Sequence, residues 1–121
     1  MKLIHAGFRV ENLEEEIELY ESLGFVVSRR FEKPEPRAQV AILKSSDGSG
    51  VELWQFKEEH PYNEFIGRHV AFICNDVRKD AERLMQAGFQ TVIPFTEGVI
   101  LDYIFVQDKF GLVYELAQEK S

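Results

Sequence analysis

The chain nearly repeats itself halfway along its length. Residues 4–31 resemble residues 68–95 when the sequence is shifted by 69 − 5 = 64 positions. The shift pairs residues of similar type: His5 with His69, Leu13 with Val77, Gly24 with Gly88, Phe25 with Phe89 and Phe31 with Phe95. A shift of 115 − 52 = 63 pairs Glu52 with Glu115, so one loop must be a residue shorter in the second copy than in the first. Two copies are too few for a solenoid, so the repeat predicts a pair of similar modules.

Each copy begins with the pattern of a strand followed by a helix. Residues 3–10 form a short apolar run typical of a strand, and Asn12 can cap the helix that follows. An apolar stripe continues to Gly24, a residue that favours the end of a helix. The second copy carries the same signals, with Asp76 as the cap and Gly88 as the end.

Three strand-like runs follow each predicted helix. They cover residues 25–31, 38–43 and 51–56 in the first copy, and residues 89–95, 100–107 and 112–117 in the second. The pattern predicts an α+β fold of two βαβββ modules, residues 1–57 and 68–118, within a single domain that covers residues 1–121. The polar segment 57–68 contains Pro61 and Gly67, so we expect it to be the linker between the modules.

Composition excludes several classes of partner. The 121 residues are 45% hydrophobic, which is typical of one globular domain. Lys and Arg number 14 and Asp and Glu number 21, so the net charge of −7 repels nucleic acids and anionic membranes. The single cysteine, Cys74, cannot form an internal disulfide. No segment has the pattern of a secretory signal or a membrane span, so we expect a soluble, cytoplasmic protein.

Alternation along the strands places two histidines and two glutamates on particular sheet faces. His5 lies on the face opposite Phe8 and Val10, and His69 lies opposite three bulkier neighbours: Val70, Phe72 and Cys74. We expect the bulkier faces to pack under the helices, which leaves both histidines on the opposite faces. The glutamates have mostly apolar companions on their own faces: Trp54 and Phe56 beside Glu52, and Val113 and Ala117 beside Glu115.

These four residues are candidate metal ligands. If the modules pair around a pseudo-two-fold axis, His5, Glu52, His69 and Glu115 meet in one cavity. Two imidazoles and two carboxylates suit zinc, nickel, cobalt, iron or manganese, and they leave a six-coordinate ion two open positions. A lone strand histidine is more often structural, and a lone glutamate can simply face water. His60 has no counterpart in the other copy, so we expect it to have a structural role and not to bind a metal.

The chain resembles the vicinal oxygen chelate superfamily, which includes glyoxalases, bleomycin resistance proteins and dioxygenases. The resemblance runs through IHAGFRVENLEEEIELYESLGF, VELWQF, HVAFICNDVRKDAERLMQAGF and GLVYEL. It implies a glyoxalase-like fold, in which two βαβββ modules form a pseudo-symmetric open barrel. The family's metal-ligand positions correspond to His5, Glu52, His69 and Glu115. This complete set looks most like the short microbial glyoxalase I, or lactoylglutathione lyase, type.

That resemblance implies a lyase or isomerase that depends on one divalent metal ion per site, with nickel, cobalt or zinc favoured. Such an enzyme converts the hemithioacetal of methylglyoxal and a thiol into a thioester through a metal-stabilised enediolate. By resemblance Glu115 is the catalytic base, and Glu52 can act on the opposite face of the substrate.

The expected substrate-binding residues are Arg9, Trp54 and Phe56. Arg9 matches a family arginine that binds the γ-glutamyl carboxylate of glutathione, although a surface ion pair would explain it equally well. Phe56 stands where glutathione-using relatives carry an asparagine, and no cluster of basic residues is evident at the later glutathione-binding positions. Together with Phe105, these aromatic residues indicate a less polar pocket.

Other functions within the superfamily remain open alternatives. Coenzyme A thioester epimerases usually carry glutamine at the position of Glu52. Ring-cleaving dioxygenases would use only His5, His69 and Glu115 as iron ligands. Resistance-type proteins bind a small molecule in the same cleft and generally lack the metal ligands. In each case we expect a homodimer, with the site formed within one chain or between two.

Overall fold

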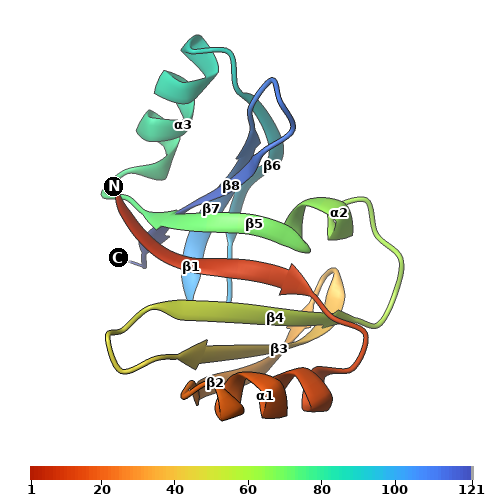
Figure 1. Ribbon diagram of the computed structural model, residues 1–121. Coiled ribbons are helices and arrows are strands. Elements are labelled where there is room, and N and C mark those ends of the chain that lie inside the picture. Colours follow the sequence, from red (N-terminus) through yellow and green to blue (C-terminus); the bar gives the residue numbers. More distant parts are fainter. Residues whose placement is uncertain (121) are drawn as a thin grey trace. The chain divides into compact units, whose positions relative to one another are not determined.

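The computed structural model describes residues 1–120, which form two compact units (Figure 1). One unit comprises residues 5–68, and the other comprises residues 1–4 together with residues from 69 onward. Each βαβββ module contains four strands and a helix of ten residues. The α+β class and the two βαβββ modules are therefore confirmed. Within the described residues, none of the helices is both long and apolar enough to cross a membrane.

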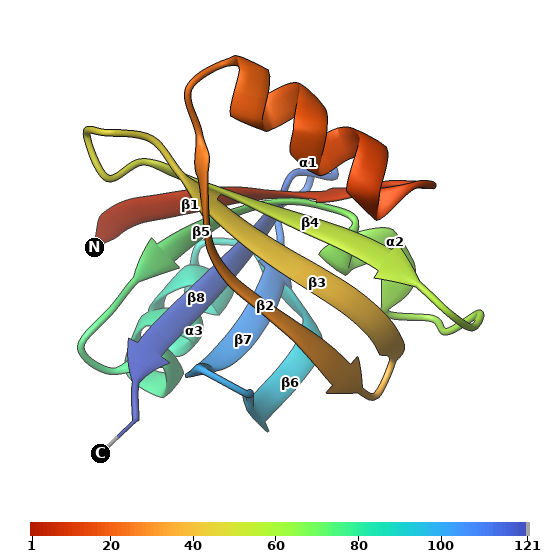
Figure 2. The same cartoon turned by 90° about the horizontal axis from the view of Figure 1, so that it is seen from below.

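The first module contains four strands and two helices. Their bounds are β1 (Lys2–Arg9), α1 (Leu13–Ser22), β2 (Val26–Pro34), β3 (Arg37–Lys44), β4 (Gly50–Phe56) and α2 (Asn63–Ile66). The strand order is β2-β3-β4-β1, in which β1 runs parallel to β4 and the other neighbours are antiparallel. Helix α1 packs against β2, β3 and β4 (Figure 2).

The second module repeats this topology. Its elements are β5 (Arg68–Ile73), α3 (Val77–Gln86), β6 (Gln90–Glu97), β7 (Leu101–Gln107) and β8 (Val113–Glu119). The order is β6-β7-β8-β5, again with one parallel pair, β5 and β8. Helix α3 packs against β6, β7 and β8, so each helix covers one face of its own sheet.

Both long helices begin at the predicted caps. The Asn12 side chain accepts a hydrogen bond of 3.1 Å from the backbone N–H of Glu15, and the Asp76 side chain accepts one of 3.1 Å from Lys79. These bonds satisfy N–H groups that the first helical turn would otherwise leave without a partner. The two modules therefore share the same type of helix cap, at equivalent positions of the repeat.

A second pair of contacts anchors each helix to its own sheet. The Gln55 side chain on β4 accepts a bond of 2.8 Å from the backbone N–H of Leu13, and Gln118 on β8 accepts one of 2.9 Å from Val77. The two glutamines are 118 − 55 = 63 positions apart, the same shift as the glutamates. Sequence analysis did not identify these anchors, although the repeat contains them.

In the two modules, the prediction that the bulkier strand faces pack beneath the helices is confirmed only in part, because Phe8 is 42% exposed, whereas Val10 and Cys74 pack in the cores. In the first, α1 and the covered sheet face share a cluster of buried residues: Leu13, Ile17, Ala41, Leu43, Val51 and Leu53. The equivalent cluster beneath α3 comprises Cys74, Val77, Ala81, Ile104, Val106 and Leu116. Both clusters alternate along their strands with the candidate site residues, which therefore lie on the uncovered side of each sheet.

The segment that we expected to be a polar linker contains the short helix α2. Asn63 and Ile66 of this helix are buried. The Gly67 carbonyl then accepts a bond of 2.9 Å from the backbone N–H of Arg9. A Cβ atom at Gly67 would lie 2.8 Å from the Arg9 Cβ, so this close approach favours glycine. Four residues are too few to show helical periodicity, which is why the sequence did not predict α2.

Strand β2 is also longer than its predicted range. It continues to Pro34, and β3 begins at Arg37, so only a two-residue turn separates the strands, whereas the predicted runs ended at residue 31 and resumed at residue 38. Lys33 pairs with Ala38 in this extension and is buried. Charged and proline residues suggested a loop, but pairing with β3 overrides that local preference.

Candidate functional site

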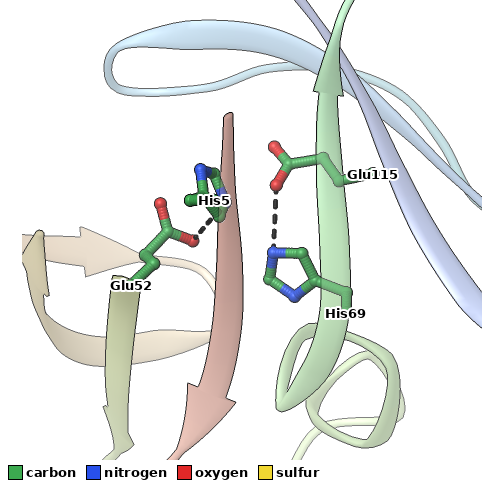
Figure 3. A group of neighbouring side chains, drawn as sticks. All are labelled: His5, Glu52, His69 and Glu115. Carbon is green, nitrogen blue, oxygen red and sulfur yellow. Dashed lines mark ion pairs between the residues drawn. The ribbon is translucent and has the colours of Figure 1, made fainter. Parts of the chain in front are cut away.

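The first module brings His5 and Glu52 together from two neighbouring strands. In the register of β1 and β4, Gly7 is opposite Glu52, so His5 and Glu52 point from the same sheet face. The His5 Nε2 atom lies 3.5 Å from Oε1 of Glu52, and the two side chains are 10% and 11% exposed (Figure 3). A carboxylate with this little contact with water needs polar partners, and the imidazole is one of them.

A tryptophan supplies another partner for Glu52. The indole Nε1–H of Trp54 donates a hydrogen bond of 2.7 Å to Glu52 Oε1, and both residues are buried. Trp54 follows Glu52 by two positions on β4, which places the side chains on one face. Sequence analysis placed Trp54 in the pocket wall but did not identify its bond to the carboxylate.

The second module holds His69 and Glu115 in the equivalent arrangement. Ala71 of β5 is opposite Glu115 of β8, which puts both site side chains on the uncovered sheet face. Nε2 of His69 lies 3.1 Å from Oε1 of Glu115 (Figure 3). The side chains are 0% and 10% exposed. Phe105 is opposite Glu115 on β7, and its ring forms a T-shaped contact with the imidazole of His69, with 4.9 Å between ring centroids.

The spacing within each pair fits two ligands of one metal ion. Nitrogen and oxygen atoms about 2.1 Å from an ion lie about 3.0 Å apart at a right angle and about 3.4 Å apart at a tetrahedral angle. The measured separations of 3.5 Å and 3.1 Å are close to these values. Each module therefore contains one imidazole and one carboxylate that suit a divalent cation.

The predicted substrate-binding residues line the same face of the first module as Glu52. The rings of Trp54 and Phe56 are stacked, with 5.7 Å between centroids. The guanidinium of Arg9 lies 5.4 Å from the centroid of the Phe56 ring. Arg9 also lies 3.9 Å from the exposed carboxylate of Glu59, a separation that gives only a weak ion pair. Arg9 is therefore beside the aromatic wall and has a second, surface contact.

Sequence analysis missed a second basic residue on this face. Lys33 on β2 pairs with Ala38, and Ala38 pairs with Phe56, so all three side chains point to one side of the sheet. Lys33 is buried, unlike the partly exposed Arg9. The expected loop around residue 33 concealed this placement, because only a strand fixes which face a side chain occupies.

Two other reactive side chains lie apart from these pairs. Nδ1 of His60 accepts a bond of 3.1 Å from the backbone N–H of Tyr62, which gives His60 a role within its loop. Cys74 is on the helix-covered face of the second module. Burial, together with a hydrogen bond to Asp80, raises the pKa of the Cys74 thiol to about 11. Cys74 therefore stays a neutral thiol near pH 7.

Comparison with known proteins identifies the family. The family model described as the Glyoxalase/Bleomycin resistance protein/Dioxygenase superfamily matches residues 2–116. The chain belongs to this superfamily. A superfamily member similar in sequence is the lactoylglutathione lyase of Neisseria meningitidis serogroup A, which is 30% identical. The match covers 100% of this chain and 93% of the relative.

Several solved structures share the fold of this chain. The methylmalonyl-CoA epimerase of Mycobacterium tuberculosis has a TM-score of 0.83 and 20% identity, covering 99% of this chain and 89% of its own. The Streptomyces coelicolor methylmalonyl-CoA epimerase, in complex with 2-nitronate-propionyl-CoA, has a TM-score of 0.82 and 23% identity. That match covers 100% of this chain and 99% of the other. The glyoxalase-like fold predicted from the sequence is confirmed.

Proposed function

We propose that the protein is a metal-dependent isomerase of the glyoxalase I type. The observation that carries this proposal is the pair of buried imidazole–carboxylate contacts, one in each module. The lactoylglutathione lyase relative, 30% identical over the whole chain, supports the same chemistry. The substrate class is a hydroxy ketone in which the hydroxyl-bearing carbon also carries a thiol sulfur.

The proposed metal ligands are His5, Glu52, His69 and Glu115, one imidazole–carboxylate pair from each module. Two carboxylates balance the charge of one divalent ion, and two neutral imidazoles complete a nitrogen and oxygen set that suits nickel, cobalt or zinc. Iron and manganese accept the same donors. The proposal requires one pair from each module, contributed by one chain or by the two chains of a homodimer.

In the proposed reaction, the two glutamates move a proton between adjacent carbons. A bound divalent ion supplies a Lewis acid for negative charge on the substrate oxygens. Glu115 removes the hydrogen from the sulfur-bearing carbon and returns a proton to the neighbouring carbon. The proton of the first hydroxyl passes to the former ketone oxygen, so the first hydroxyl becomes the thioester carbonyl and the ketone becomes an alcohol. Glu52 can perform the same transfer on the opposite face, and such transfers typically contribute about 10²- to 10⁴-fold to the rate.

The substrate proposed for this site carries a negative charge. Arg9 and Lys33 lie on the same sheet face as Phe56, so two cations flank an aromatic side chain. The guanidinium and ammonium groups suit a carboxylate or phosphate, and the aromatic ring suits an apolar portion of the same molecule. Glutathione carries two carboxylates, and coenzyme A carries phosphates, so both thiols satisfy this charge requirement.

A direct assay tests the proposed function. The purified protein is freed of metal and reloaded separately with nickel, cobalt and zinc, and bound metal is measured by elemental analysis. Each form is then given the hemithioacetal of methylglyoxal and glutathione, and thioester formation is followed. We expect one ion per site and turnover above the buffer rate with at least one metal. His69→Ala is expected to lose both the ion and the turnover.

Two outcomes would contradict the proposal in different ways. Binding of none of the three ions would exclude the metal-dependent enzyme. Binding without thioester formation would exclude the glyoxalase I reaction and direct attention to epimerisation. Exchange of the hydrogen beside the carbonyl of methylmalonyl-CoA in deuterated water tests that second reaction, which removes a proton from the carbon next to a thioester carbonyl. His60→Ala is the matched control, because His60 lies in a loop contact.

A further inference from the structure

The chain's single tryptophan is bonded directly to a candidate metal ligand. Trp54 Nε1–H donates to Glu52 Oε1 at 2.7 Å, and the same oxygen lies 3.5 Å from His5 Nε2. All three side chains belong to one sheet face of the first module. An indole N–H is a donor only, so it can pair with a carboxylate oxygen but cannot replace that carboxylate as a ligand.

We propose that Trp54 is a positioning residue that holds the Glu52 carboxylate in place for metal binding. This role rests on the proposed function, because it assigns a task to the neighbour of a proposed ligand. The indole occupies one lone pair of Oε1, which restricts rotation of the carboxylate and leaves its other lone pairs for an ion. Outer contacts of this kind orient ligands, and losing one typically lowers metal affinity about 10- to 100-fold.

Packing gives Trp54 the rigidity that this task requires. Its ring is stacked on Phe56 at 5.7 Å between centroids and 28° between planes, and Val40 is opposite it on β3. Trp54 is buried, so its N–H has little access to water as an alternative partner. The packing around Trp54 therefore holds its indole in position to donate to Glu52.

The repeat does not duplicate this arrangement. The position equivalent to Trp54 is 54 + 63 = 117, where the second module has Ala117, whose methyl group cannot donate a hydrogen bond. Trp54 therefore distinguishes the two glutamates. We assign Glu52 as the carboxylate held by an indole, which favours a fixed ligand over a mobile base.

Because Trp54 is the chain's single tryptophan, its fluorescence reports on Glu52 without an activity assay. Metal-free protein is titrated with nickel, cobalt or zinc while the tryptophan emission is recorded, and the stoichiometry is measured independently by calorimetry. We expect the emission to change and to saturate at the same metal ratio as the heat. An ion that binds without changing the emission would contradict direct contact between the indole and the metal ligand.

Affinity measurements on variants test the positioning role. Trp54→Phe keeps an aromatic ring but removes the donor, and it should weaken metal binding about 10- to 100-fold. Replacing Trp54 with benzothienylalanine, in which sulfur substitutes for the N–H, keeps the shape of the indole and guards against a folding defect. Phe56→Leu is the comparison variant: it loosens the stack but keeps the bond to Glu52, so its loss of affinity should be smaller than that of Trp54→Phe. In a Glu52→Ala background, which removes the acceptor of this bond, Trp54→Phe should change affinity far less than it does in the wild-type background.

The possible results separate this inference from the proposed function. Wild-type protein that binds none of the three ions contradicts both. Folded Trp54→Phe and benzothienylalanine variants that bind metal as tightly as wild type contradict the role of Trp54 alone. Loss of affinity in both variants, with a smaller loss in Phe56→Leu, supports it.

Discussion

The two modules use the same pair of ligand types in different surroundings. In the first, Glu52 accepts an indole hydrogen bond from its own strand, and Ile42 is the residue opposite it on β3. In the second, Phe105 is opposite Glu115 on β7 and touches the imidazole of His69. The aromatic side chain thus lies on the glutamate's strand in one module and on the neighbouring strand in the other.

This difference shows which parts of a repeat can diverge. The histidines and glutamates supply charge and lone pairs, which no apolar residue can replace. The neighbouring positions supply support, and several side chains can support a carboxylate or an imidazole in different ways. The two modules therefore share the same ligand residues but differ in the side chains around them. This difference allows the two glutamates to have different roles.

Exchanging each glutamate for its amide is expected to give the largest effect. Glu115→Gln removes the proposed base, so kcat should fall about 10²- to 10⁴-fold. Glu52→Gln removes the carboxylate that Trp54 holds, so we expect its main effect on metal affinity. Steady-state kinetics at saturating metal separate the two variants. Equal losses of kcat with unchanged metal affinity would show that the surroundings do not distinguish the glutamates.

Removing the aromatic support of the second module should destabilise the fold. Phe105 is buried and fills the space beside His69, so Phe105→Ala should lower the free energy of unfolding by about 3–5 kcal/mol. Ile42→Ala at the equivalent position should cost less, because Ile42 is partly exposed. Chemical denaturation measures both values, and a larger loss for Ile42→Ala would reverse the comparison.

The helix anchors should respond alike in the two modules. Gln55→Ala and Gln118→Ala each leave a helix N–H without its side-chain partner, which should cost about 1–3 kcal/mol in unfolding free energy. Denaturation curves of the single and double variants test this prediction, and we expect the two costs to be similar and to add. A loss of unfolding free energy in only one of the two variants would show that the two hydrogen bonds, although similar in length, contribute differently to stability.

A turn aspartate should give the smallest effect, and one that depends on pH. Hydrogen bonds from the Ser45 and Ser49 hydroxyls and from the Ser49 backbone N–H lower the pKa of Asp47 to about 2 from 3.8. A depressed folded-state pKa stabilises the protein above pH 4, and this contribution is lost as pH falls towards 2.

Asp47→Asn should therefore lower Tm slightly near pH 6, and the difference from wild type should shrink near pH 2. Thermal unfolding followed by circular dichroism at both pH values measures the effect. Asp108 occupies the corresponding turn of the second module and accepts bonds from two backbone N–H groups. Asp108→Asn is the matched comparison. A Tm difference for Asp47→Asn that is the same at both pH values would contradict the charge-dependent explanation.

Much of the fold could be predicted because its signals are local or repeated. Asn12, Asp76, Gly24 and Gly88 mark helix ends by their own backbone and side-chain preferences. Strand β2 was less predictable, because Lys33 and Pro34 disfavour a strand locally while pairing with β3 stabilises one. Helix α2 was not predicted, because its four residues depend on burial of Asn63 and Ile66.

The sequence by itself determined the two modules, their strand faces and the four candidate ligands. The repeat and the alternation of apolar and polar residues can both be recognised from the order of residues alone. Only the tertiary structure decided which side chains support those ligands. The bond from Trp54 to Glu52, the contact of Phe105 with His69 and the burial of Lys33 depend on strand register and rotamers. Residue order does not encode these distances directly, because they arise when separate strands pack together.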